Sequence, residues 1–350
     1  MSTQRSAEMR DGASGVSSSG TSGDLLDGLI VDGSRGQYRV ETTAGVLVCT
    51  IRGRLRKQLE YPTSTGGRKG VRKVIVKEHD PVAVGDRVRV LATGGGSGVV
   101  EEVIARASGA FTRDDPDRGQ GRLTAVAGLD QMIAVFAASN PEPPLRMLDR
   151  FLVLAESQEI AAIICLNKVD LGIAAWLAER LQVYRAAGYP VIETSAEQGI
   201  GVEALRAQLS GRTSALLGPS GVGKSSLLNA LEPDLGQRVS AVSGASHKGR
   251  HTTSGTRLVP LAGPAGGYLA DTAGMRALAL SGAARRQLDW CFPEIRPRLG
   301  ACRLSDCSHR HEPACAVRAA VQRGLVDRDR YASYVRLLVG GADEQWEGME

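Results

Sequence analysis

The chain has 350 residues, of which 42% are apolar, so it can bury cores in two or three domains and is not a wholly disordered protein. Its most apolar stretch, residues 160–166, is far shorter than the ~20 residues of a transmembrane helix, and the N-terminus lacks a secretory signal. Six cysteines are too few for a disulfide scaffold, and three of them crowd between residues 302 and 315, which suits a reducing cytoplasm and one metal site. The net charge of +5 is modest, but nine Lys and Arg residues against one acid lie between residues 52 and 77.

The N-terminal third predicts a tail and a small barrel. Residues 1–26 are rich in Ser and Gly without periodicity, so we expect them to be disordered. In residues 27–106, short runs alternate apolar and polar side chains between Gly, Asp and Pro. Five or six short strands indicate a closed β-barrel, with the OB-fold as the leading candidate. The basic segment within it is the expected RNA-binding surface, and a merely solvated charged face is the alternative.

The middle of the chain, residues 107–280, predicts an α/β domain, because strand-like and helical segments alternate along it. The expected strands are 132–138, 160–166, 190–195 and 214–217, and the expected helices are 145–158, 173–187 and 201–209. Alternation of this kind predicts a mostly parallel sheet covered on both faces. Residues 281–350 are expected to form a helical domain around the Cys/His cluster.

A glycine-rich segment after the last of these strands matches the phosphate-binding loop pattern, Gly-x4-Gly-Lys-Ser/Thr, and opens an amphipathic helix. Backbone N–H groups of such a loop surround phosphate oxygens at a helix N-terminus. Lys224 would reach the β- and γ-phosphates, and the Ser225 hydroxyl would bind Mg²⁺. A Gly-rich turn without a ligand is the alternative. The expected phosphate-site residues are Gly218, Pro219, Ser220, Gly221, Val222, Gly223, Lys224, Ser225 and Ser226.

Three further motifs complete a nucleotide site. Asp271-Thr-Ala-Gly274 suits a carboxylate on the Mg²⁺ side and a backbone amide that senses the γ-phosphate. In Asn167-Lys168-Val169-Asp170, the Asp170 carboxylate can accept two hydrogen bonds from guanine that adenine cannot offer. Ser195 and Ala196 follow the next strand and suit the companion loop, where a backbone amide meets the guanine oxo group.

Together these motifs resemble the GTPase motif set, but the base-recognition motifs precede the phosphate loop, which is the order of circularly permuted GTPases. With a basic barrel before it and a Cys/His cluster after it, the chain from about residue 27 to 340 resembles the RsgA (YjeQ) family of small ribosomal subunit biogenesis GTPases. The resemblance implies a circularly permuted P-loop GTPase domain preceded by an OB-fold barrel and followed by a zinc-binding helical domain. It also implies a late role in maturing the small subunit, with hydrolysis of GTP to GDP stimulated by that subunit and driving release.

The resemblance implies further expectations about partners. GTP or GDP with Mg²⁺, the small ribosomal subunit and its rRNA are the expected partners of a cytoplasmic monomer that does not bind membranes. One rival is a permuted GTPase of the large subunit, against which the barrel and the zinc site argue. Another is a non-catalytic, guanine-nucleotide-sensing RNA-binding module. An ATP-using kinase is excluded by Asn167 and Asp170.

Residues 249–254 (GRHTTS) are the candidate first switch. A Thr hydroxyl there would complete the Mg²⁺ shell, and we favour Thr253 over Thr252. Met275 follows Gly274, where Ras-like enzymes place a water-orienting Gln, and Met cannot orient water. The family resemblance implies that a His of the first switch takes that role, so His251 is the expected catalytic residue. The alternative is an exposed His on a mobile loop.

Three cysteines and a histidine near the C-terminus have metal-ligand spacing. Cys302, Cys307, His309 and Cys315 offer three thiolates and one imidazole within 14 residues, which predicts one closed, structural Zn²⁺ site per chain. His311 competes with His309, and the resemblance favours His309. Unmetallated buried thiols are the alternative.

Overall fold

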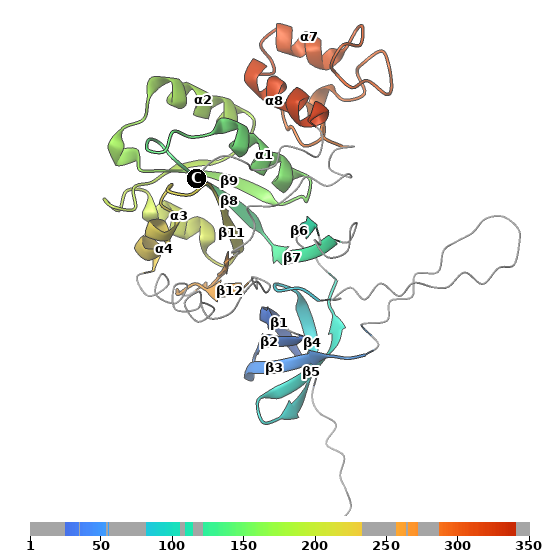
Figure 1. Cartoon of the computed structure of the whole chain (residues 1–350), viewed down its shortest axis with the longest axis vertical. Coiled ribbons are helices and arrows are strands. Elements are labelled where there is room, and N and C mark those ends of the chain that lie inside the picture. Colours follow the sequence, from blue (N-terminus) through green and yellow to red (C-terminus); the bar gives the residue numbers. More distant parts are fainter. Residues whose placement is uncertain are drawn as a thin grey trace, which may run out of the picture.

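The computed structural model describes residues 25–34, 36–53, 55, 82–105, 109–114, 122–232, 257–263, 265–271 and 287–340. A β-barrel, a helix-covered sheet and a small helical unit follow one another along the long axis of the molecule (Figure 1). Within the described residues no helix is long and apolar enough to cross a membrane. The predicted tail up to residue 24 and most of the basic segment, residues 56–81, lie outside the described residues.

The barrel has the strand order of an OB-fold. Its strands are β1 (Leu25–Ser34), β2 (Gln37–Thr42), β3 (Gly45–Ile51), β4 (Arg87–Gly94) and β5 (Ser97–Val103). β1, β2 and β3 pair antiparallel, β3 pairs parallel with β5, and β4 returns from β5 to β1, so the ring closes. Alternate side chains of β3, namely Leu47, Cys49 and Ile51, fill the interior. The predicted barrel is confirmed.

A hairpin that the sequence patterns did not predict connects the barrel to the next unit. β6 (Gly109–Asp114) and β7 (Arg122–Leu129) form their own two-stranded sheet. The segment is polar, and only its ends are apolar, so periodicity gave no strand signal. Phe111 and Val126 pair in register and are fully buried, which anchors the hairpin in the main core.

The central sheet has the order β10-β9-β8-β11-β13-β12, and all its neighbours are parallel except β12. Its strands are β8 (Gln131–Ala137), β9 (Ala161–Asn167), β10 (Val191–Glu193), β11 (Thr213–Leu217), β12 (Arg257–Pro260) and β13 (Tyr268–Asp271). Every residue of β8 is buried, as expected for a central strand covered on both faces. The seven strands and helices predicted between residues 132 and 217 match the observed bounds to within two residues.

Two helix pairs cover this sheet. The helices are α1 (Leu145–Glu156), α2 (Ala175–Ala186), α3 (Val202–Leu209) and α4 (Lys224–Leu231). Leucines of α1 and α2 join one core with Met132 and Phe136 of β8, whereas leucines of α3 and α4 join a second core with Ile133 and Val135. Successive β8 residues therefore serve opposite faces of the sheet.

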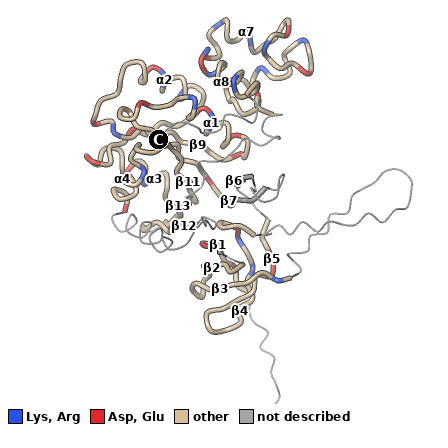
Figure 2. Tube along the Cα trace, viewed as in Figure 1, with Lys and Arg blue, Asp and Glu red and all other residues tan. Residues whose placement is uncertain are grey.

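The C-terminal unit contains the short helix η3 (Arg296–Arg298), α7 (Ala316–Gln322) and α8 (Arg328–Val339). Its own small core, which includes Phe292, Ile295 and Tyr334, also takes in Val153 of α1. Charged residues of both signs lie along α1, α2 and α8 (Figure 2). Arg180 of α2 forms a two-pronged ion pair with Asp327, the N-cap of α8, at 2.8 and 3.0 Å.

A buried arginine holds this unit to the central sheet. Arg330 of α8 has no exposed surface, and its guanidinium lies 2.7 Å from both Asp149 of α1 and Glu294. Burial acts to lower the pKa of Arg330, but Asp149 and Glu294 raise it above its ordinary value, so the side chain remains charged. The rings of Phe292 and Tyr184 lie within 4.7 and 5.4 Å of the guanidinium carbon.

Replacing Arg330 with Ala is expected to lower the free energy of unfolding by about 3–5 kcal/mol, because Asp149 and Glu294 would stay buried without their cation. Denaturant titration measures the change. Arg328→Ala is the matched control, because Arg328 is exposed on the same helix and should change stability by no more than about 0.5 kcal/mol. Equal stability of the two variants would contradict this role for Arg330.

Candidate functional site

The phosphate-loop segment connects β11 to α4, as the motif requires. Two of its glycines have no room for a side chain. A Cβ at Gly218 would lie 2.1 Å from the backbone oxygen of Val135. A Cβ at Gly223, whose φ is +91°, would lie 2.4 Å from Nδ2 of Asn167. The glycines therefore let the loop lie directly against β8 and the end of β9.

The loop presents a polar outer face at the start of α4. Ser220, Gly221, Ser225 and Ser226 are exposed, whereas Val222 is buried in the core beneath α3 and α4. A helix N-terminus with exposed backbone and hydroxyl groups suits an anion. The residues present therefore fit a bound phosphate chain.

The side chain of Lys224 lies along the inside of the loop. Its Nζ donates hydrogen bonds to the backbone oxygens of Gly218 and Pro219, at 2.8 and 2.6 Å. The ammonium group is thus held at the loop that would surround the phosphates. This position is compatible with the expected contact to β- and γ-phosphate oxygens.

Asn167 joins three loops. Its side chain is 1% exposed, and Nδ2 donates to the backbone oxygen of Val222 at 2.9 Å. Its Oδ1 accepts from the Thr194 hydroxyl at 3.2 Å and from the Ala196 backbone N–H at 3.3 Å. One buried amide therefore connects the phosphate loop, the Asn-Lys-x-Asp segment and the Thr-Ser-Ala segment, which are distant in sequence.

The predicted base-binding residues lie beside this amide. Lys168 has a left-handed backbone (φ 62°), and its Nζ donates to the backbone oxygen of Asn140 at 2.6 Å. Asp170 lies in the short helix η1 (Val169–Leu171) and is partly buried. The sequence patterns missed Asn140, because its contribution is a backbone carbonyl that carries no residue-type signal.

The Thr-Ser-Ala segment forms a tight turn after β10. Ser195 is fully buried, and its hydroxyl accepts a hydrogen bond from the Gln198 N–H at 3.1 Å. A bridge between Ser195 and Ile200 closes the turn. The turn is thereby fixed next to Asn167 and Lys168, where a guanine-facing loop must lie.

The Mg²⁺-side and switch residues are only partly visible. Asp271 is the last residue of β13, which pairs in parallel with β11, so its backbone lies near the start of the phosphate loop. Three of the predicted site residues, His251, Thr253 and Gly274, lie outside the described residues.

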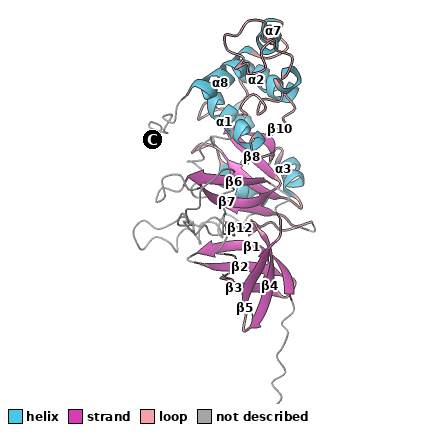
Figure 3. Cartoon of the chain, turned by 90° about the vertical axis from the view of Figure 1, so that its right-hand side faces the viewer, coloured by secondary structure: helices cyan, strands magenta, loops and turns pink. Residues whose placement is uncertain are grey.

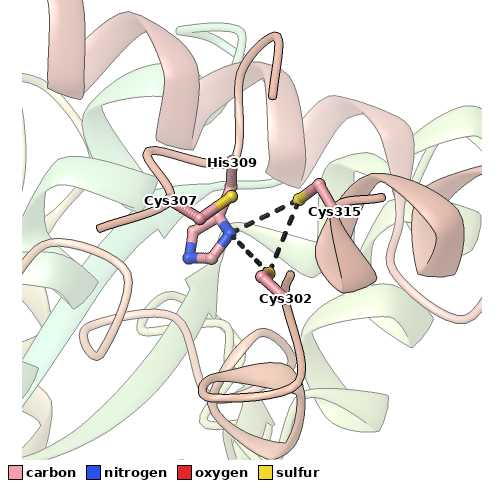
Figure 4. A group of neighbouring side chains, drawn as sticks. All are labelled: Cys302, Cys307, His309 and Cys315. Carbon is pink, nitrogen blue, oxygen red and sulfur yellow. Dashed lines mark hydrogen bonds between the residues drawn. The ribbon is translucent and has the colours of Figure 1, made fainter. Parts of the chain in front are cut away.

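The four predicted metal ligands converge in the C-terminal unit (Figure 4). The ligand atoms of Cys302, Cys307, His309 and Cys315 all lie within 4.8 Å of one another. Nδ1 of His309 is 3.5 Å from the sulfur atoms of both Cys302 and Cys315, which are 3.9 Å apart. His311 is exposed and does not belong to the cluster.

These spacings fit a tetrahedral zinc ion. With Zn–S and Zn–N bonds of ordinary length, the sulfur atoms should be about 3.8 Å apart and each about 3.6 Å from the nitrogen. Desolvation and the nearby thiols of Cys315 and Cys302 raise the pKa of the Cys307 thiol to about 12. A divalent cation would reverse this by favouring the thiolates, so the chemistry of the donor set suits Zn²⁺.

Other side chains hold the ligands in place, and the sequence patterns missed them. Nε2 of His309 faces a carboxylate oxygen of Asp289 at 3.6 Å, which leaves Nδ1 toward the cysteines. Tyr331 of α8 donates to the His309 backbone oxygen at 2.6 Å. Glu312 accepts from the backbone N–H groups of Ser308, Arg310 and His311 at 2.9–3.1 Å.

The chain is similar to known proteins in both sequence and structure. The sequence profile described as RsgA GTPase matches residues 105–281. A small ribosomal subunit biogenesis GTPase RsgA from Gemmatimonas aurantiaca is 45% identical over 89% of this chain and 95% of its own length. A protein of the same name from Moorella thermoacetica is 38% identical over 89% of this chain and 96% of its own length.

Two solved structures share the fold. YjeQ from Thermotoga maritima aligns with a TM-score of 0.68 and 31% identity, covering 91% of this chain and 99% of its own. YloQ, described as a circularly permuted GTPase, aligns with a TM-score of 0.64 and 27% identity, covering 90% of this chain and 94% of its own. On the identity and coverage of these relatives, the chain belongs to the RsgA family of circularly permuted GTPases.

Proposed function

We propose that this GTPase acts in late maturation of the small ribosomal subunit, which stimulates its hydrolysis of GTP, and that hydrolysis releases it. The observation that carries the proposal is the combination of units: one amide, Asn167, joins the phosphate and base loops, with an OB-fold barrel on one side and a Cys₃His cluster on the other. The names of the relatives support the choice of the small subunit. The protein acts as a cytoplasmic monomer.

The described loops would bind different parts of GTP, the phosphates and the guanine. The backbone N–H groups from Ser220 to Ser226 would surround the phosphates, and Lys224 would neutralise part of their charge. Lys168 and Asp170 hold the guanine, with Ser195 and Ala196 forming the opposite wall.

Mg²⁺ would supply positive charge that stabilises the phosphate oxygens during transfer. The Ser225 hydroxyl, Thr253 and the Asp271 carboxylate would hold it, and the Gly274 backbone would sense the γ-phosphate. His251 would orient the attacking water, because Met275 offers no group that could.

The outer units would bind the subunit. The barrel, residues 27–106, contacts rRNA through its basic segment, whose Lys and Arg side chains recognise backbone and shape. The GTPase domain comprises residues 107–280, and residues 281–350 form the zinc domain. One Zn²⁺ at Cys302, Cys307, His309 and Cys315 stabilises that domain, which has a small core of its own.

Single-turnover GTP hydrolysis with purified subunits tests the proposal. Saturating small subunits should accelerate hydrolysis by about 100-fold, the scale of a positioning effect, and large subunits should not. His251→Ala should retain GTP and subunit binding but lose most of the acceleration. His247→Ala, from the same segment, is the matched control.

Acceleration by large subunits instead would assign the chain to the other subunit. No hydrolysis under any condition would favour a nucleotide-sensing RNA-binding protein. Wild-type turnover by His251→Ala with small subunits would transfer the water-orienting role to a ribosomal group.

The base specificity is expected to depend on Asp170. Asp170→Asn should weaken GTP binding by about 100-fold, because two hydrogen bonds to a charged acceptor are lost. The same variant should bind xanthosine triphosphate better than the wild type does, because the xanthine 2-oxo group complements the new amide. Competition binding with GTP, XTP and ATP measures both effects. Equal affinity of the wild type for ATP and GTP would contradict the assignment.

The purified protein is expected to carry about one zinc ion per chain. Cys307→Ala should lose the metal and destabilise the C-terminal unit while sparing nucleotide binding. Cys291→Ala is the matched control, because this buried thiol lies in the same core outside the cluster. Elemental analysis gives the answer, and zinc-free wild-type protein purified without chelator would exclude the site.

A further inference from the structure

Strand β1 pairs with strands of both the barrel and the GTPase domain. Residues Leu25–Leu29 pair with β4 inside the barrel, whereas Asp32 pairs with Arg257 of β12 in the central sheet. A bulge between Ile30 and Asp32 marks the change. The barrel and the GTPase sheet thus form one continuous sheet, with β1 directly beside β12 at the junction (Figure 3).

The bulge is anchored on one side and continues to β12 on the other. Ile30 exchanges backbone hydrogen bonds with Gly85 and Asp86, at 2.8 and 3.0 Å. The segment containing Gly85 in turn accepts a hydrogen bond from Ala127 of β7 through the oxygen of Val84, at 2.8 Å. A movement of the barrel is therefore transmitted to Asp32 through the hydrogen-bonded backbone at Ile30 rather than through a flexible linker.

Acidic side chains of the barrel contact the last two strands, β12 and β13, at one edge of the GTPase sheet. Nε of Arg257 on β12 lies 4.0 Å from a carboxylate oxygen of Asp32, and both side chains are about one-third exposed. The Tyr268 hydroxyl on β13 donates to Glu41 of β2 at 3.1 Å. Carboxylates repel an RNA backbone, so these two groups serve the junction between units rather than the RNA surface.

The two contacts hold opposite ends of the β12–β13 pair. In that pair Arg257 is opposite Asp271, and Tyr268 is opposite Pro260. The Asp32–Arg257 contact therefore lies at the strand end that carries the expected Mg²⁺-side residue. In the sequence, Arg257 comes three residues after the end of the predicted first switch, residues 249–254.

We propose that Arg257 is a positioning residue through which the barrel acts on GTP hydrolysis. Asp32 holds Arg257, and Arg257 fixes the end of β12 against the Asp271 position of β13 in the arrangement that only the subunit-stimulated reaction requires. Binding of subunit RNA by the barrel strengthens this arrangement. By linkage, bound GTP must then strengthen the barrel's hold on RNA by the same factor. This inference rests on the proposed function, since it assumes that the barrel binds subunit RNA.

The test uses the full-length protein with Asp32→Asn and, separately, Arg257→Asp. Subunit affinity in the GDP state and unstimulated hydrolysis should stay at wild-type values. Hydrolysis stimulated by saturating small subunits should fall about fivefold, the effect that one partly exposed ion pair can have on an equilibrium. The ratio of RNA affinities with a GTP analogue and with GDP should shrink by a similar factor.

Two further variants separate coupling from loss of structure. The charge-swapped protein, Asp32→Arg with Arg257→Asp, should regain most of the stimulation. Asp27→Asn is the matched control, because Asp27 lies on the same strand but pairs at 3.6 Å with Arg89 of the barrel strand β4, on the exposed surface of the barrel. It should behave as the wild type.

Wild-type stimulation in both single variants would overturn the inference, and so would a charge swap that restores nothing. A wild-type protein that small subunits fail to stimulate would instead refute the proposed function. In that event the affinity for a single-stranded RNA oligonucleotide, compared between GTP-analogue and GDP states, still decides the inference. A nucleotide dependence that Asp32→Asn leaves unchanged would overturn it.

Discussion

The hydrogen bonds of one buried amide, Asn167, hold the phosphate loop against the two base loops of the nucleotide site. These loops begin at the ends of β9, β10 and β11, and backbone hydrogen bonds, such as that from the Thr194 N–H to the Leu166 oxygen, also join the first two of them. The amide donates to the phosphate loop at Val222 and accepts from Thr194 and Ala196 of the segment after β10, which neither Asp nor Leu could do. Gly223 complements it, because any side chain there would occupy the position of the amide nitrogen.

Permutation places this arrangement in an unusual order along the chain. The base loops are complete before the phosphate loop begins, and β12 and β13 come last in the sheet. Whatever follows β13 is therefore attached to the strand that ends at Asp271. The barrel, which precedes the GTPase domain in the sequence, contacts the same strand pair through β1. Both outer units are thus connected to the edge of the sheet that is formed by its last two strands in sequence, β12 and β13.

Sequence patterns predicted most of this architecture. Three of the signals are local, because each depends on residues that are close together in the sequence. They are the buried run of β8, the alternating positions of β3 and the spacing of the metal ligands. The β6–β7 segment was missed because it lacks apolar alternation, and the Asn140 carbonyl because a backbone group carries no residue-type signal. Arg330 was missed for a different reason, because its role depends on partners distant in sequence, such as Asp149, which is 181 residues away. An Arg within a helix reads as a solvated side chain until its partners are placed around it.

The contacts of α1 make the domain boundary near residue 280 misleading as a folding boundary. One side of α1 contributes Leu148 and Leu152 to the sheet core, and Val153 belongs to the C-terminal core. Asp149 on the same helix depends on Arg330 and Ser333 of α8. A fragment that ended after the last GTPase motif would keep every nucleotide-binding residue and still bury an unneutralised carboxylate. A fragment that folds on its own must therefore extend through α8, and the central sheet and the C-terminal unit are expected to unfold together.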